Sequence, residues 1–215
     1  MSLASLTLFT TNAGDSGVLL PVALVGSAVL WFFHSRRLAW LLLRSVLAAA
    51  LVISLLKLWF LSCGAHWTTA LISPSGHACM SAAVYGCLAS LLARGQNARV
   101  RWALYAGAVL IVAVEGITRI TLGAHSWPEV LVGTLVGAAA WAWFALSYGR
   151  LTPVAVDRRT LGVSLAVTVL VVYGVRLPAE SLLRHAARRL SENCALAAPV
   201  RHELPLPAAG AGGGG

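Results

Sequence analysis

The sequence predicts an all-α protein, a polytopic bundle of about six transmembrane helices. Hydrophobic residues make up 59% of the chain and charged residues 11%, whereas soluble proteins carry about a quarter charged residues. The mean hydropathy is +0.81. Several apolar runs reach the roughly 20 residues that cross a bilayer, and arginine clusters separate them at alternate connections. These patterns indicate membrane helices.

The apolar runs give the helices in order. The predicted spans lie at roughly 17–34, 38–62, 77–93, 102–122, 127–148 and 161–178. The first run is not expected to be a cleavable signal peptide, because Met1 to Ser16 has no basic segment and no small-residue cleavage site. No internal repeat or second domain is evident, so residues 1–178 are predicted to form one membrane-embedded domain.

The connections alternate in charge. Those after the first, third and fifth spans carry arginines, namely Arg36, Arg37, Arg94, Arg99, Arg101, Arg150, Arg158 and Arg159, whereas loops 63–76 and 123–126 carry no lysine or arginine. The positive-inside rule therefore places both uncharged loops and both termini outside a bacterial inner membrane, in the periplasm. The net charge of +9 fits this topology and not nucleic-acid binding.

The C-terminal segment is different in character. Residues 179–198 place Leu182, Leu183 and Leu190 on one helical face and arginines on another, which predicts an amphipathic helix on the membrane surface. Its arginines lie on the side assigned as outer, where Glu180, Glu192 and Glu203 balance them in part. Residues 199–215 are rich in Pro, Ala and Gly, which predicts disorder.

The four cysteines show no metal-binding or redox spacing. Cys79 and Cys87 lie inside an apolar run, where cysteine is usually a small core residue. Cys63 and Cys194 could both face an oxidising compartment and form a disulfide. No His, Cys, Asp and Glu cluster has the spacing of metal ligands, so no metal is expected.

Charged residues inside spans are costly and need a reason. Lys57 is the only lysine, and it lies within ~8 Å of the outer end of its span at 1.5 Å per residue. Glu115 and Arg119 lie near the outer end of the fourth span. Arg44 lies near an inner end, where its side chain is expected to reach the headgroups.

Both uncharged loops place a histidine beside a helix start. The first reads Ser73-Pro74-Ser75-Gly76-His77, and the second reads Gly123-Ala124-His125-Ser126-Trp127-Pro128-Glu129. A helix start offers free backbone N–H groups and so favours anions.

With these motifs, the sequence resembles the type-2 phosphatidic acid phosphatase superfamily, the membrane lipid phosphate phosphatases related to vanadium haloperoxidases. Pro74-Ser75-Gly76-His77 matches the second part of that family's signature. Thr118-Arg119, His125 and Glu129 match the third part with every spacing intact, and Lys57 matches the start of the first part.

The resemblance implies an active site at the outer helix ends. It implies that His125 attacks phosphorus to form a phosphohistidine, that His77 protonates the leaving group and then activates water, and that Glu129 holds His125. Lys57, Ser75, Gly76 and Arg119 would bind the phosphate, without a metal or cofactor. The implied partner is a lipid phosphate or polyprenyl diphosphate in the membrane. A lipid phosphotransferase and a catalytically impaired lipid-phosphate binder remain alternatives.

The chain also departs from the family pattern. Where the family has Arg-Pro, six residues after the lysine, this chain has Gly64-Ala65, and His66 or Arg176 could replace the missing cation. Thr118 stands for serine, and Glu129 stands for aspartate.

Two motif residues have a structural alternative. Glu129 and Ser126 have the spacing of a helix capping box, so Glu129 could cap a helix, hold His125, or do both. Glu115 and Arg119 are one turn apart and could neutralise each other, although support of Arg119 by Glu115 is the preferred interpretation.

Overall fold

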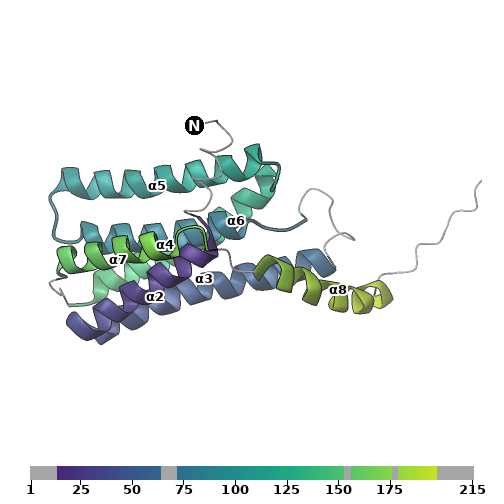
Figure 1. The fold of residues 1–215 in the computed structure, drawn as a ribbon, viewed down its shortest axis with the longest axis horizontal. Coiled ribbons are helices and arrows are strands. Elements are labelled where there is room, and N and C mark those ends of the chain that lie inside the picture. The colour runs from purple at the N-terminus through teal and green to yellow at the C-terminus, as the bar shows by residue number, and fades with distance from the viewer. Residues whose placement is uncertain (1–13, 64–71, 153–155, 176–178, 198–215) are drawn as a thin grey trace, which may run out of the picture.

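The computed structural model describes residues 14–63, 72–152, 156–175 and 179–197, and all secondary structure in these ranges is helical. The helices are α2 (Ser16–Phe33), α3 (Arg36–Ser62), α4 (Gly76–Ala93), α5 (Ala98–Thr121), α6 (Trp127–Arg150), α7 (Arg158–Val172) and α8 (Ala179–Ala197). Helices α2 to α7 run side by side, and α8 lies beyond the bundle along the end of α3 (Figure 1). The predicted all-α polytopic bundle is confirmed.

Five of these helices, α2 to α6, are long and apolar enough to cross a membrane. The sixth predicted span, 161–178, corresponds to α7, which ends at Val172 and has 15 residues. At 1.5 Å per residue it reaches about 22 Å, short of a hydrocarbon core of about 30 Å. Tyr173 has an extended backbone, and Gly174 follows with a φ of 86° that ends the helix.

Local sequence signals start most of the helices. A short polar side chain at the N-cap accepts a hydrogen bond from a first-turn backbone N–H, which satisfies a donor that the helix leaves free. These caps are Asp15, Ser35, Ser75, Asn97 and Asp157.

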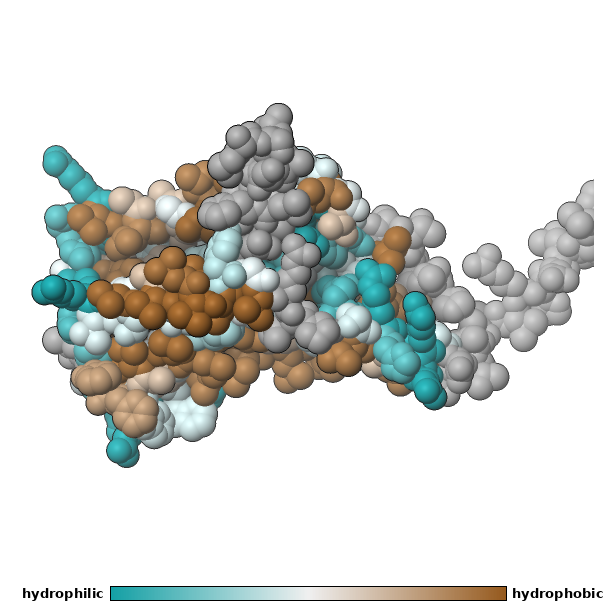
Figure 2. Space-filling model, viewed as in Figure 1, coloured by the Kyte–Doolittle hydropathy of each residue, from teal (hydrophilic) through white to brown (hydrophobic). Residues whose placement is uncertain are grey.

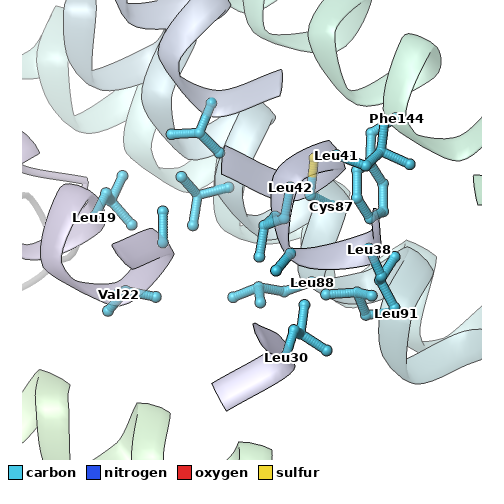
Figure 3. Close-up of a cluster of buried hydrophobic side chains, with 14 of the residues drawn as sticks. Leu19, Val22, Leu30, Leu38, Leu41, Leu42, Cys87, Leu88, Leu91 and Phe144 are labelled. Carbon is cyan, nitrogen blue, oxygen red and sulfur yellow. The ribbon is translucent and has the colours of Figure 1, made fainter. Parts of the chain in front are cut away.

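The apolar core joins α2, α3, α4 and α6. Leu19, Leu42, Leu91 and Phe144 are almost completely buried in it, and Figure 3 shows these side chains converging from the four helices. The outer surface is also apolar, with Leu51, Leu110 and Leu135 exposed on α3, α5 and α6. Figure 2 shows apolar residues across the middle of the visible face and hydrophilic residues toward both ends, the pattern of a membrane-spanning bundle.

Glycines on α6 let it approach α4 at the end that carries the motifs. A Cβ at Gly133 would clash with the Ser75 carbonyl, and a Cβ at Gly137 would clash with the Cys79 carbonyl. Such small residues four apart permit close helix packing in membranes. The approach brings the starts of α4 and α6 together, and Ser75 donates its N–H to the Glu129 carbonyl at 2.9 Å.

Candidate active site

His125 and Glu129 form a direct pair at the start of α6. The distance between His125 Nδ1 and Glu129 Oε2 is 3.0 Å, and both side chains are 8% exposed. A carboxylate on one ring nitrogen fixes the orientation of the imidazole and leaves Nε2 for chemistry. The pair therefore has the geometry of a nucleophile with its orienting acid.

Glu129 also accepts hydrogen bonds from the backbone of two segments. Its Oε2 accepts a hydrogen bond from the Ser126 N–H at 3.0 Å, as in a capping box. Its Oε1 accepts from the N–H groups of Ile72 and Ser73 at 2.9 and 2.7 Å, so it ties the segment before α4 to α6. Both interpretations of Glu129 are thus compatible, because one carboxylate caps the helix and contacts His125.

A tight turn places His125 beside the end of α5. The Arg119 carbonyl accepts hydrogen bonds from the N–H groups of Ala124 and His125 at 3.0 and 3.2 Å. Gly123 supplies the turn with a φ of 63°, a left-handed conformation that glycine adopts at little cost. Five residues between Arg119 and His125 are therefore enough to reverse the chain.

The environment of His125 favours its neutral form. Burial lowers the pKa of His125, and the positive charges of Lys57 and Arg119 lower it further, against the opposing effect of the Glu129 contact. A neutral imidazole is the form that can attack an electrophile.

The Pro-Ser-Gly-His motif forms the start of α4, next to Lys57. The Ser75 hydroxyl accepts from the Ala78 N–H at 3.4 Å, and a Cβ at Gly76 would lie 3.5 Å from Lys57 Cε. Lys57, Gly76 and His77 line one cavity of about 200 Å³. Arg119 and His125 do not line this cavity, although the positive charge of Lys57, which does line it, acts on His125.

Two acidic residues that the motifs did not indicate lie in this cavity. His77 Nε2 lies 3.5 Å from Asp15 Oδ2, while the other oxygen of Asp15 accepts from the Gly17 N–H at 2.7 Å. Lys57 forms an ion pair with Glu180 of α8. Both acids are far from the motifs in sequence. Asp15 lies just before an apolar run and Glu180 lies at the start of an amphipathic run, and this position was the only feature of the sequence that could have drawn attention to either acid.

Glu180 is held as a carboxylate. Burial raises its pKa, but the hydrogen bond and charge of Lys57, with the charge of Arg184, bring the pKa below its usual value. Arg184 Nε lies 3.2 Å from the second oxygen of Glu180. Helix α8 therefore packs on α3 and reaches into the cavity through Glu180.

Glu115 and Arg119 occupy the last turns of α5. Glu115 is 2% exposed, and its carboxylate accepts a hydrogen bond from the Gly14 N–H. Its charge also interacts with that of Arg119, as expected for residues one turn apart. The Thr118 hydroxyl donates to the Glu115 carbonyl at 2.8 Å, so it serves the helix backbone.

Several sequence-level expectations fall outside the described residues. Gly64, Ala65, His66 and Arg176 lie there, as do residues 199–215 and the side chain of Cys194. Cys63 is disulfide-bonded, whereas Cys79 and Cys87 are buried free thiols. In the part of the chain that the structure describes, no three His, Cys, Asp or Glu side chains gather as metal ligands.

Comparison with known proteins identifies the family of the chain. The PAP2 superfamily matches residues 38–153, from the start of α3 to just beyond α6. An uncharacterized 22.5 kDa protein in the cps region of Klebsiella pneumoniae is 33% identical over 182 residues, which cover 81% of this chain and 86% of that protein. No solved structure matches. The chain is a multi-pass membrane protein that belongs to the PAP2 superfamily, whose members are phosphatases.

Proposed function

We propose that this protein is an integral membrane phosphatase that hydrolyses a phosphomonoester or pyrophosphate on a lipid through a phosphohistidine at His125. The observation that carries the proposal is the His125–Glu129 pair at 3.0 Å, with the positive charges of Lys57 and Arg119 acting on His125, in a chain of the PAP2 superfamily. The 1–178 region is the phosphatase domain.

The first step transfers the phosphoryl group to the protein. Nε2 of neutral His125 forms a bond to phosphorus while Nδ1–H donates to Glu129, and the bond from phosphorus to the lipid oxygen breaks. Protonated His77 donates its proton to that oxygen. Asp15 Oδ2, 3.5 Å from His77 Nε2, lies on the side of the ring that faces the cavity.

The second step releases inorganic phosphate. His77, now neutral, takes a proton from water, and the water oxygen bonds to phosphorus as the bond to His125 breaks. Lys57, Arg119, the Ser75 hydroxyl and the Gly76 N–H stabilise the negative charge on the phosphoryl oxygens. Lys57 is ion-paired with Glu180, so the phosphate competes with that carboxylate for the ammonium group.

The periplasmic side of the inner membrane is the proposed location of the site. The arginine-rich connections lie at the opposite end of the bundle, which supports this orientation. The disulfide-bonded Cys63 lies at the end of α3 near Lys57, and disulfides persist in oxidising compartments.

Phosphate release from a panel of lipids tests the function. The panel comprises phosphatidic acid, phosphatidylglycerol phosphate, undecaprenyl diphosphate and lipid A phosphates, each with purified protein in detergent. We expect wild type to release phosphate from at least one lipid and His125→Ala to release none. His185→Ala is a matched control, because His185 is exposed on α8. Binding without release by wild type would favour an impaired lipid-phosphate binder.

A further inference from the structure

A second candidate binding site lies at the end of the bundle away from His125. Helices α3 and α6 border an open groove of about 620 Å³, which is lined by Arg37, Trp40 and Arg44 from α3 and by Trp143 and Ser147 from α6. Arg37 and Arg44 are two turns apart, so they share one face of α3.

The depth of Arg44 makes this groove unusual. Arg44 lies eight residues beyond the start of α3, about 12 Å along a membrane-spanning helix at 1.5 Å per residue. A charged side chain at such depth needs polar partners, which the headgroup region supplies because a long arginine side chain extends toward it. Arg44 Nε donates to the Trp40 carbonyl at 3.3 Å, which uses one of its five N–H donors.

The groove carries positive charge without an acid. None of the residues that line it is Asp or Glu, and the ion pairs found within the described ranges do not include Arg37 or Arg44. Two guanidinium groups in this setting favour an anion with several oxygen acceptors, and phosphate matches their geometry.

The surface next to the groove is apolar, which indicates that a ligand bound there has an apolar part. Leu47, Leu51 and Leu55 continue the helical face of Trp40 and Arg44 toward the other end of α3, and they are 48%, 60% and 56% exposed. Along this face Arg37, Trp40 and Arg44 come before the leucines, so cationic and aromatic residues lie at the headgroup end and apolar residues lie toward the acyl chains. A free anion would not need the leucines.

We propose that this groove binds an anionic phospholipid from the leaflet opposite the catalytic end. Arg37 and Arg44 hold the headgroup phosphate, Trp40 and Trp143 flank it, and an acyl chain lies along Leu47 and Leu51. The site is separate from the proposed catalytic residues and does not depend on the proposed reaction.

Native mass spectrometry of the delipidated full-length protein tests the site. Palmitoyl-oleoyl phosphatidylglycerol or phosphatidylcholine is added in equal amounts, and the bound lipid is counted. We expect wild type to retain phosphatidylglycerol preferentially, and Arg37→Gln/Arg44→Gln to reduce that retention about tenfold or more through loss of charge-assisted contacts. Arg99→Gln/Arg159→Gln removes the same charge at exposed positions outside the groove and should retain wild-type binding.

A second variant tests whether the shape of the groove, and not only its positive charge, is needed for lipid binding. Ser147→Phe keeps both arginines and places a bulky ring in the groove, so it should weaken the retention of phosphatidylglycerol as the arginine variant does. Thermal unfolding without lipid checks the fold of each variant, and Ser147→Phe decides alone if the arginine variant does not fold. Every variant keeps the catalytic end unchanged, so the amount of lipid bound at that end should be the same in wild type and in the variants.

Three results would overturn the proposal. They are equal retention of both lipids by wild type, retention of phosphatidylglycerol by Ser147→Phe, and displacement of phosphatidylglycerol by excess inorganic phosphate. The last result would indicate a site for small anions in place of a lipid site.

Discussion

At the scale of single residues, the proposed chemistry depends on one carboxylate with two tasks. Glu129 contacts the nucleophile candidate His125 and also accepts three backbone hydrogen bonds. The family pattern pointed to the first task and the capping-box spacing to the second. The structure adds the link to Ile72 and Ser73, which no local pattern could reveal because they lie 57 and 56 positions from Glu129.

Glu129→Gln tests the orienting role. It removes the negative charge and leaves one acceptor oxygen where the carboxylate uses both, so we expect kcat to fall by about 10² to 10⁴, as for other orienting acids. Glu129→Asp restores the family residue and should retain more activity than Glu129→Gln. Steady-state kinetics on the preferred lipid give kcat, and thermal unfolding shows whether the fold is intact. Equal kcat for Glu129→Gln and wild type would contradict the role.

Glu180→Gln tests whether this carboxylate competes with phosphate. Because Glu180 is ion-paired with Lys57, its removal should lower the inhibition constant of inorganic phosphate. A partly exposed ion pair is worth up to about 1 kcal/mol, which corresponds to a change of about fivefold. Ser181→Ala, at an exposed neighbouring position, is the control. An unchanged or higher inhibition constant would show that Glu180 does not occupy the phosphate position.

The lowered pKa of His125 predicts a pH dependence. Attack requires the neutral ring, so kcat/KM should rise with pH through the pKa of His125, with its acid limb below the ordinary value of 6.5. Arg119→Gln removes one of the charges that lower this pKa, so its acid limb should move to higher pH. Arg99→Gln, on the first turn of the same helix, should leave the profile unchanged. If the acid limb of Arg119→Gln lay at the same pH as that of wild type, the charge of Arg119 would have no effect on the pKa of His125.

At the scale of helices, the close contact between α4 and α6 positions the motifs. Gly133 and Gly137 lie against backbone carbonyls of α4, and the same contact holds the hydrogen bond from Ser75 to Glu129. Composition and spacing predicted both helices, but not that these glycines face α4. Hydropathy also extended the last predicted span to residue 178, because it does not register the turn at Gly174 that ends α7.

Gly133→Ala should destabilise the protein and impair the site. Its Cβ would clash with the Ser75 carbonyl, and overpacking of this kind costs typically about 1–3 kcal/mol. Gly162→Ala on α7 is the matched control, because nothing lies within 4 Å of its new Cβ. We expect a lower melting temperature in detergent for Gly133→Ala and an equal or higher one for Gly162→Ala. The reverse order would contradict the packing described here.

At the scale of the whole molecule, the candidate site includes residues that lie outside the region matched to the family. The match covers residues 38–153, a range that contains every residue that the motifs predicted. Asp15 and Glu180 come from outside it and meet His77 and Lys57 through tertiary contacts. The sequence was thus sufficient for the fold class and for the core of the candidate site. It was insufficient for the acidic partners, because no spacing rule links residues more than 60 positions apart.

The sidedness of the molecule follows from its arginines and is open to direct measurement. Ala124→Cys, in the loop beside His125, should react with a membrane-impermeant maleimide in intact cells with a permeabilised outer membrane. Arg99→Cys, at the opposite end, should react only after lysis of the inner membrane. The opposite labelling pattern would place the candidate site at the cytoplasmic leaflet.

The covalent intermediate is the most direct test of the proposed activity. The protein is mixed with a lipid substrate that carries ³²P in its terminal phosphate, denatured in alkali to preserve phosphohistidine, digested, and analysed for labelled peptides. The account predicts label on His125 in wild type and in His185→Ala, and none in His125→Ala. Phosphate release by wild type with no label on His125, or hydrolysis that persists in His125→Ala, would contradict it.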